Sequence, residues 1–374
     1  MPARHLYVHV PFCSRRCTYC DFSIAVRRNT PVDDFVEGLR LELASRTADP
    51  PRDDWERDWQ LDTLYLGGGT PSRLGSRGVA RVLETIAEFA LLAPTAEITI
   101  EANPEDVTPA AAVEWLQAGV NRLSIGAQSF DDSVLKWMHR VHDSHEIGSA
   151  VRAAQSAGFD NISLDLIFAL PDSVERSWDR DLDQALSLDP RHISLYGLTL
   201  EPTSPLGRQF ARGSLGSQSD ERYSAEFLQA HERTSRAGFE HYEVSNFALP
   251  GRRSRHNSAY WSGAAYLGVG PSAHSFDGTS RRWNVAPYVE WLKRLRAGQS
   301  VIAGSEQLTE SDRASEAVYL GLRTTDGYRI SEKERPTIAR WQHAGWATVD
   351  DVTLRLNPEG WLRLDALAAG LTVS

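Results

Sequence analysis

All three cysteines of the 374-residue chain lie in one short segment, CSRRCTYC, as Cys13, Cys17 and Cys20. An odd number of cysteines packed so closely cannot form a disulfide framework, so a metal centre is the better interpretation. Three thiolates on one loop can hold three corners of a four-iron cluster and leave the fourth iron open to an outside ligand. Zinc is the alternative, because His5 or His9 could complete its coordination, and redox-active thiols are another.

The cysteine spacing resembles that of the radical S-adenosylmethionine proteins. In that family the amino and carboxylate groups of S-adenosylmethionine bind the open iron, and an electron from the [4Fe-4S] cluster cleaves the sulfonium to give a carbon radical. The resemblance implies a [4Fe-4S] cluster on Cys13, Cys17 and Cys20, with S-adenosylmethionine beside it.

A second set of residues could bind that nucleoside. The glycine run GGGTP, residues 67–71, ends an apolar segment and lets backbone groups approach a ligand closely. Glu101, Gln128 and Asp165 fall at or just past the ends of further apolar segments, and Arg140 follows soon after. Carboxylates and amides suit ribose hydroxyls and an amino group, and arginine suits a carboxylate. Taken singly, each is equally a hydrogen-bonded polar residue at a strand end.

These motifs resemble the oxygen-independent coproporphyrinogen III dehydrogenases and their relatives, the HemW-type haem chaperones, over essentially the whole chain. The resemblance implies one set of contacts to S-adenosylmethionine and a second set around the same cavity, where the dehydrogenases bind a second molecule. The first set is Tyr7, Gly68, Gly69, Thr70 and Glu101, and the second is Tyr19, Gln128, Arg140 and Asp165. Whether a second molecule binds in this chain stays open.

Two departures favour the chaperones over the dehydrogenases. The dehydrogenases carry a further cysteine two residues after the third, where this chain has Phe22, and they have a longer extension before the cysteine loop. The segment HNSAYW, His256 to Trp261, matches the HNxxYW motif of the chaperones. An imidazole can bind haem iron, and Tyr260 and Trp261 offer flat apolar surface to a porphyrin.

Other basic residues near this motif have weaker assignments. Arg252, Arg253 and Arg255 could pair with haem propionates, and His274 is a weaker candidate near the same site. Without the resemblance, His256 would be interpreted as a surface or capping residue and the aromatic pair as core. His139, His142 and His145 are expected on the surface of helices.

The elements that must position these groups alternate between strands and helices up to about residue 245. Six apolar segments are expected as strands: LYVHV, DTLYLGGG, EITIEAN, NRLSIGAQS, ISLDLIFALP and HISLYGLTL. Three helices are expected to end at a glycine, in QAGV, SAGF and RAGF, because glycine accepts the left-handed conformation that closes a helix. The pattern predicts an α/β fold, a partial (βα)6 barrel with its chemistry at the carboxyl ends of the strands.

After about residue 247 the pattern changes. HNSAYW and the glycine-rich YLGVGPSAHS are expected as a loop segment, followed by helices, a hairpin in WATVDDVTLRL and a closing helix. We expect a radical S-adenosylmethionine domain over residues 1–245 and a smaller α+β, winged-helix-like domain over 246–374.

Composition narrows the function further. The formal charge of −10 disfavours a general nucleic-acid binder, which needs a basic face. No apolar run is long enough to span a bilayer, and the first residues lack a secretion signal, so a cytoplasmic location is expected, with peripheral association at the inner membrane face left open. The resemblance implies that haem is cargo passed to apo-haemoproteins, such as respiratory oxidases or reductases, and that a homodimer forms. Radical decarboxylation of coproporphyrinogen III is the alternative function, and a radical enzyme acting on an unrelated substrate is a third.

Overall fold

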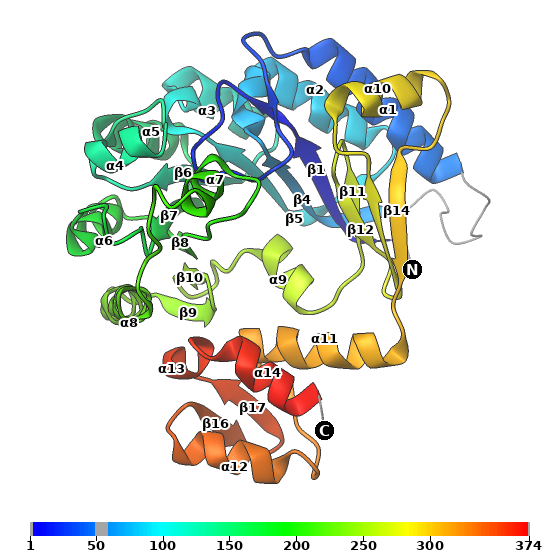
Figure 1. The fold of residues 1–374 in the computed structure, drawn as a ribbon. Helices are drawn as coiled ribbons and strands as arrows, with labels where there is room; N and C mark the ends of the chain where they lie inside the picture. Colours follow the sequence, from blue (N-terminus) through cyan, green and yellow to red (C-terminus); the bar gives the residue numbers. More distant parts are fainter. Residues whose placement is uncertain (1–2, 49–58, 373–374) are drawn as a thin grey trace.

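The computed structural model describes residues 3–48 and 59–372, and a curved twelve-stranded sheet forms its centre (Figure 1). Six neighbouring parallel strands of this sheet coincide with the six segments expected from the sequence, so the prediction of a partial (βα)6 barrel is confirmed. They are β1 (His5–Val10), β4 (Gln60–Gly68), β5 (Leu91–Ala102), β6 (Arg122–Gln128), β7 (Ile162–Phe168) and β8 (His192–Gly197).

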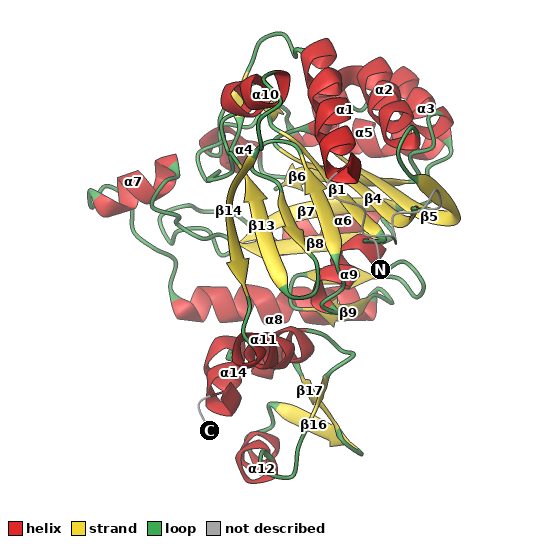
Figure 2. Ribbon diagram, turned by 90° about the vertical axis from the view of Figure 1, so that its right-hand side faces the viewer, coloured by secondary structure: helices red, strands yellow, loops and turns green. Residues whose placement is uncertain are grey.

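Helices cover the outer face of these strands (Figures 1 and 2). The three glycines expected to close helices, Gly119, Gly158 and Gly238, have φ values of 106°, 107° and 86°, the left-handed region that glycine occupies without strain. The helices of this part are α1 (Val32–Ala48), α2 (Gly75–Ala87), α3 (Pro109–Gln117), α4 (Asp132–Trp137), α5 (Ser144–Ala157), α6 (Trp178–Ser187), α7 (Pro205–Ala211) and α8 (Asp220–Arg236).

The sheet continues beyond the six expected strands on both edges. On one edge β11 (Tyr266–Val269) runs parallel to β1 and leads into antiparallel β12 (His274–Phe276), β13 (Ser280–Asn284) and β14 (Ile302–Gln307), with α10 (Tyr288–Arg296) between the last two. On the other edge β10 (Asn246–Ala248) and β9 (Glu240–Glu243) follow β8. The expectation that YLGVGPSAHS is a loop was therefore wrong, because it contains β11 and the start of β12.

HNSAYW is also not a loop. It forms α9 (Arg255–Trp261), whose first turn is held by a residue far away in the sequence. Glu97 of β5 accepts hydrogen bonds from the backbone N–H groups of Arg255 and His256, each at 3.0 Å. Ser254 caps the helix by accepting from the N–H of Asn257. The carboxylate thus satisfies two of the N–H groups that a helix start leaves unpaired.

The C-terminal part is a small α+β unit below the sheet in Figure 1. Its β16 (Ala347–Asp350) and β17 (Thr353–Leu356) form the expected hairpin, and β15 (Tyr328–Arg329) pairs with β17. Its helices are α11 (Glu310–Arg323), α12 (Arg335–His343), α13 (Pro358–Trp361) and α14 (Leu364–Thr372). The division at residue 245 stays a prediction, and strands β10 to β14 beyond it belong to the central sheet.

Candidate functional site

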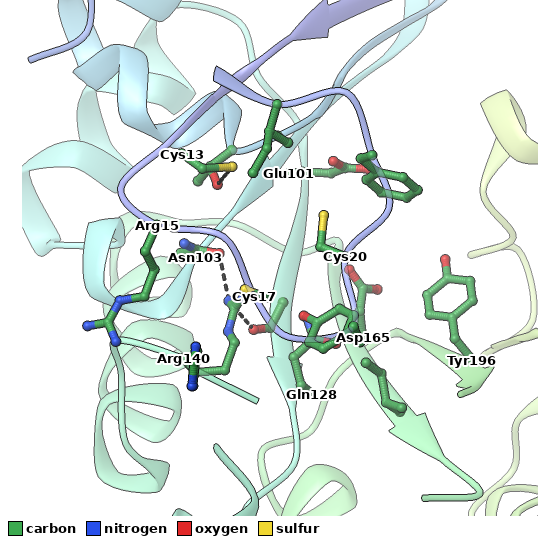
Figure 3. A pocket seen from close by; sticks show the side chains of 18 of the residues that line it. Cys13, Arg15, Cys17, Cys20, Glu101, Asn103, Gln128, Arg140, Asp165 and Tyr196 are labelled. Carbon is green, nitrogen blue, oxygen red and sulfur yellow. Dashed lines mark hydrogen bonds between the residues drawn. The ribbon is translucent and has the colours of Figure 1, made fainter. Parts of the chain in front are cut away.

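A cavity of about 540 Å³ lies at the carboxyl ends of the parallel strands, and all three cysteines line it (Figure 3). The cysteine loop follows β1 and is pinned by a short pairing of β2 (Phe12–Cys13) with β3 (Ala25–Val26). The Phe12 ring is fully buried and packs edge-on against Phe35 and Tyr288, with centroids 5.5 and 5.0 Å away. The apolar core therefore fixes the residue next to Cys13.

The cysteine thiols form no disulfide and are each partly buried. Burial raises the pKa of Cys13 to about 11, although a hydrogen bond with Thr70 at 3.4 Å opposes the shift. Burial likewise raises the pKa of Cys20. Metals bind the thiolate form, so loading this loop with a metal centre must release protons.

The donor set fits a cluster better than a single metal ion. Within residues 3–48 and 59–372, no group of three or more His, Cys, Asp or Glu side chains is placed to hold one ion. His9, one candidate fourth zinc ligand, already lies 3.2 Å from the Tyr7 hydroxyl and 3.1 Å from the Ser23 carbonyl oxygen. Three thiols spread around one cavity suit the corners of a larger iron–sulfur cluster.

Arg140 brings a positive charge to this loop. Its Nη1 lies 3.4 Å from Cys17 Sγ, and its Nη2 donates to Asn103 Oδ1 at 2.7 Å and to the Gly126 carbonyl at 3.1 Å (Figure 3). Burial alone would lower the pKa of Arg140, but Tyr19 and Cys17 outweigh it, so the pKa is raised. Its Nε is buried without a hydrogen-bond partner among the described residues. The guanidinium stays charged and keeps unused donor capacity at the cavity.

Glu101 at the end of β5 lines the same cavity and is hydrogen-bonded on both oxygens. The Tyr65 hydroxyl donates to Oε1 at 2.8 Å, and the Gly68 N–H donates to Oε2 at 3.0 Å. Burial raises the pKa of Glu101 to about 7, the Tyr65 hydrogen bond opposes this shift, and nearby Asp165 adds to it. The carboxyl group is thus poised to ionise near neutral pH, as is common at functional sites.

The glycine run is shaped by close packing at its last two glycines. Gly68 has φ of 111°, and a Cβ there would lie 2.7 Å from the His9 ring. A Cβ on Gly69 would lie 2.7 Å from the Pro11 backbone. The turn therefore lies directly against the start of the cysteine loop, which only glycine permits.

Gln128 and Asp165 also face this cavity (Figure 3). Gln128 ends β6 with φ of 66°, a left-handed conformation that is uncommon for residues other than glycine and often marks a functional site. Asp165 on β7 accepts from the Ser124 hydroxyl at 2.9 Å, and burial raises its pKa. Most predicted nucleoside contacts therefore meet at one cavity, lined by Gly68, Gly69, Thr70, Glu101, Tyr19, Gln128, Arg140 and Asp165.

Tyr7 is the exception, since it does not line this cavity. Its ring packs beside those of Tyr65 and His256 inside the barrel, with centroids 6.1 and 6.4 Å away, and its hydroxyl lies 3.2 Å from His9 Nδ1. Asn103 and Tyr196 also line the cavity, although neither was predicted from the sequence. Asn103 lies within the EANPE motif, whereas Tyr196 carried no signal beyond its place near a strand end.

A second cavity, of about 660 Å³, contains the end of HNSAYW. It shares no lining residue with the cysteine cavity. It lies at the opposite ends of the strands, because Tyr266, which lines it, pairs with His5, the first residue of β1. Its apolar walls include Tyr260, Trp261, Tyr266 and Phe276, and its charged residues are Arg253, Arg281, Arg313, Glu316 and Asp326.

His256 lies behind this cavity rather than in its wall. It is only 1% exposed, with Nδ1 2.7 Å from the Thr63 hydroxyl and Nε2 2.9 Å from the Tyr260 hydroxyl. Both ring nitrogens are therefore engaged.

Among the other basic residues named from the sequence, Arg253 lines this cavity, whereas Arg252 pairs with Asp160 and Arg255 donates to the Thr95 carbonyl. The expectation that His142 is a surface residue was wrong. Its ring is buried and lies 3.1 Å from Glu105 Oε2 and 3.3 Å from the Ala127 carbonyl, so the fold uses it to tie two loops together.

Comparisons with known proteins agree with this arrangement. A family model described as the radical SAM superfamily matches residues 7–185. A protein of Mycobacterium tuberculosis named heme chaperone HemW is 36% identical over 340 residues, covering 88% of this chain and 85% of that protein. The Bacillus subtilis protein of the same name is 33% identical over 333 residues, covering 87% and 86%.

A solved structure extends the likeness to the fold. Coproporphyrinogen III oxidase (HemN) from Escherichia coli, described as a radical SAM enzyme, superposes with a TM-score of 0.82 at 22% identity, covering 98% of this chain and 90% of that one. By fold, cysteine loop and sequence identity over most of its length, the chain belongs to the HemW family of the radical SAM superfamily.

Proposed function

We propose that this protein is a haem chaperone that carries a [4Fe-4S] cluster and S-adenosylmethionine. Cys13, Cys17 and Cys20 would hold three irons of the cluster, and S-adenosylmethionine would complete the coordination of the fourth. When bound, the [4Fe-4S] cluster would supply a low-potential electron to the sulfonium of S-adenosylmethionine. The placement of the three thiols around one cavity supports this assignment.

The cavity walls suit the parts of S-adenosylmethionine. Glu101, with Gly68, Gly69 and Thr70, would bind the ligand's amino group and ribose, since a carboxylate and free backbone groups recognise such donors. Tyr19, Gln128, Arg140 and Asp165 would contribute the other side of the same cavity, where Arg140 suits a carboxylate. A contact between Tyr7 and S-adenosylmethionine stays a prediction, because Tyr7 packs against Tyr65 and Gly67 and does not line the cavity.

Haem would bind as cargo in the second cavity. Flat aromatic side chains suit a porphyrin face, and arginines suit its two propionates. Arg313 is the best placed for a propionate, because the other two arginines of the cavity pair with acidic side chains, Arg253 with Glu240 and Asp326, and Arg281 with Glu316. The volume of this second cavity, about 660 Å³, falls within the usual range of ligand pockets.

The separation of the two cavities is the observation that carries this proposal. A radical enzyme must hold its substrate beside the S-adenosylmethionine carbon that becomes the radical, because the reacting atoms must touch. Here the HNSAYW cavity shares no residue with the cysteine cavity. That arrangement suits a cargo site for haem that is separate from the cluster. The bound haem would then be transferred to apo-haemoproteins such as respiratory oxidases or reductases.

The name of the two relatives, heme chaperone HemW, supports the same function. A chaperone that delivers haem to respiratory proteins would act in the cytoplasm, where it could contact the inner membrane face and form a homodimer. Across the part of the chain that the structure describes, no helix is both long and apolar enough to cross a membrane.

Haem titration of the anaerobically reconstituted protein tests the proposal. Arg313→Ala should weaken ferric haem binding by about tenfold, the effect of losing one charged hydrogen bond. Arg252→Ala is the matched control and should bind like the wild type, because Arg252 does not line the cavity. Equal affinity of the Arg313 variant, or no haem binding by the wild type, would contradict the proposed site.

The rival function needs its own assay. Coproporphyrinogen III incubated anaerobically with the protein, a reductant and S-adenosylmethionine should remain unchanged. Formation of protoporphyrinogen would favour the radical decarboxylase and exclude a pure chaperone.

The chain also lacks the dehydrogenases' additional cysteine. Phe22, which is 59% exposed and lines the cysteine cavity, occupies that position.

A further inference from the structure

Tyr260 stands between His256 and the second cavity. The two residues are one helical turn apart on α9, and the Tyr260 hydroxyl lies 2.9 Å from His256 Nε2. Tyr260 lines the cavity, whereas His256 is 1% exposed and does not. Of the two residues, Tyr260 is therefore the one that a metal centre in the cavity could reach.

The other ring nitrogen of His256, Nδ1, also has a hydrogen-bond partner. Nδ1 lies 2.7 Å from the hydroxyl of Thr63, which is fully buried, and the same hydroxyl lies 2.9 Å from Nδ1 of His5. His5 is partly exposed at the start of β1. A continuous line of hydrogen bonds thus runs from Tyr260 through His256 and Thr63 to His5.

We propose that the Tyr260 oxygen coordinates the iron of bound haem and that His256 is its hydrogen-bond partner, oriented by Thr63. The inference rests on the proposed function, in that haem occupies this cavity. Phenolate oxygen is an established class of haem ligand, alongside imidazole and thiolate. His256, Thr63 and His5 act on the iron only through Tyr260, so they are positioning residues.

The hydrogen-bond line accounts for the proton that ligation releases. The proposal requires the tautomer of His256 that carries its proton on Nδ1: before ligation Tyr260 then donates to His256 Nε2, His256 Nδ1–H donates to Thr63, and the Thr63 hydroxyl donates to His5. As the iron–oxygen bond forms, the phenol O–H bond breaks and its proton moves to Nε2. The Nδ1 hydrogen passes to Thr63, whose own proton passes to His5 and then to water. The iron stays ferric, and no electron moves.

The ligand's charge gives the site a preference for oxidation state. A phenolate anion neutralises the positive charge of ferric haem, whereas ferrous haem has no such charge to neutralise. A one-electron reductant of the dithionite class should therefore weaken haem binding, by about tenfold or more, with the phenol proton restored. Reduction would favour release of the cargo.

Spectra of the full-length protein with ferric haem test the assignment. The wild type should show phenolate-to-iron charge-transfer absorption and phenolate vibrations in resonance Raman, a readout that needs no variant. Tyr260→Phe should lose both and bind haem about tenfold more weakly. Tyr223→Phe is the matched control, because it removes a tyrosine hydroxyl that does not line this cavity and should leave the spectrum unchanged.

Two further variants test the positioning residues. Thr63→Val removes the hydroxyl with little change of shape and should shift the phenolate charge-transfer band, whereas Thr63→Ser should restore it. A wild-type spectrum typical of imidazole ligation, or a Tyr260→Phe variant with the wild-type spectrum and affinity, would overturn the inference while leaving haem binding intact. Failure of the wild type to bind haem would overturn the proposed function and the inference together.

Discussion

Tyr65 stacks on His256 inside the barrel, with ring centroids 5.0 Å apart and planes inclined by 28°. At its other end the Tyr65 hydroxyl donates to Glu101 at 2.8 Å. Glu101 lines the cysteine cavity, and His256 supports Tyr260 at the second cavity. Tyr65 of β4 thus contacts Glu101 at the cysteine cavity and His256 behind the second cavity.

Tyr65→Phe should separate the two ends of this contact. The ring remains, so stacking on His256 should persist, but the hydrogen bond that lowers the pKa of Glu101 is lost. The pKa of Glu101 should then rise further above its present value of about 7. S-Adenosylmethionine binding by the reconstituted variant, measured by calorimetry across pH, should need a higher pH than in the wild type. An unchanged pH profile would show that Glu101 does not meet the ligand's amino group.

Glu101→Gln should change how stability depends on pH in cluster-free protein. The folded-state pKa of about 7 exceeds the ordinary value of 4.5, so the folded state holds this proton more tightly than the unfolded state. The contribution is fully present below pH 4.5 and is lost as pH rises to about 7. The wild type should therefore lose up to roughly 3 kcal/mol over this window relative to the variant, at about 1.4 kcal/mol per pKa unit. Parallel curves from urea unfolding would refute the shift.

Arg140→Gln should make the cluster harder to reduce. The guanidinium beside Cys17 favours the more negative reduced state, so its removal should lower the midpoint potential. Arg15→Gln removes a charge from the same cavity without a contact to a cysteine sulfur and should change the potential less. Redox titration followed by electron paramagnetic resonance measures both. A higher or unchanged potential in the Arg140 variant would contradict its proposed effect.

Glu42→Ala should destabilise the fold strongly. This fully buried carboxylate on α1 accepts from the Gly270 N–H at 2.9 Å, Asn284 Nδ2 at 2.7 Å and Trp291 Nε1 at 2.8 Å, so it ties α1 to the far edge of the sheet. Removing it leaves several buried donors unpaired, at a cost of about 3–5 kcal/mol.

The matched control for that variant is Glu88→Ala, which breaks an exposed pair with Arg40. Exposed pairs contribute about 1 kcal/mol or less, so the control should unfold almost like the wild type. Equal urea midpoints for the Glu42 and Glu88 variants would show that the buried network does not support the fold.

The sequence carried enough information for the barrel and most of the cysteine cavity. Alternation of apolar segments with glycine-closed helices is local, and the carboxyl ends of parallel strands meet at one edge, so Glu101, Gln128 and Asp165 had to converge. What escaped prediction depends on long-range partners. The α9 helix starts on Glu97, a residue more than 150 positions earlier in the chain, and its polar residues hide its helical periodicity.

Tyr7 illustrates the same limit from within a predicted strand. The family resemblance predicted that Tyr7 contacts the ligand, yet alternation of side chains along β1 turns its ring toward the barrel interior, where it packs beside Tyr65 and His256. The engagement of both His256 nitrogens was equally hidden, because Thr63 and Tyr260 lie on different elements. The hydrogen-bond partners of a buried side chain depend on tertiary contacts, which the local sequence does not reveal.

Transfer of haem to an apo-haemoprotein tests the central claim most directly. Anaerobically reconstituted protein loaded with one equivalent of haem should restore the haem absorbance and activity of an apo-oxidase or apo-reductase faster than free haem does, and Arg313→Ala should lose this advantage. Transfer no faster than from free haem, or equal transfer by the Arg313 variant, would contradict the proposal that the second cavity carries haem for delivery.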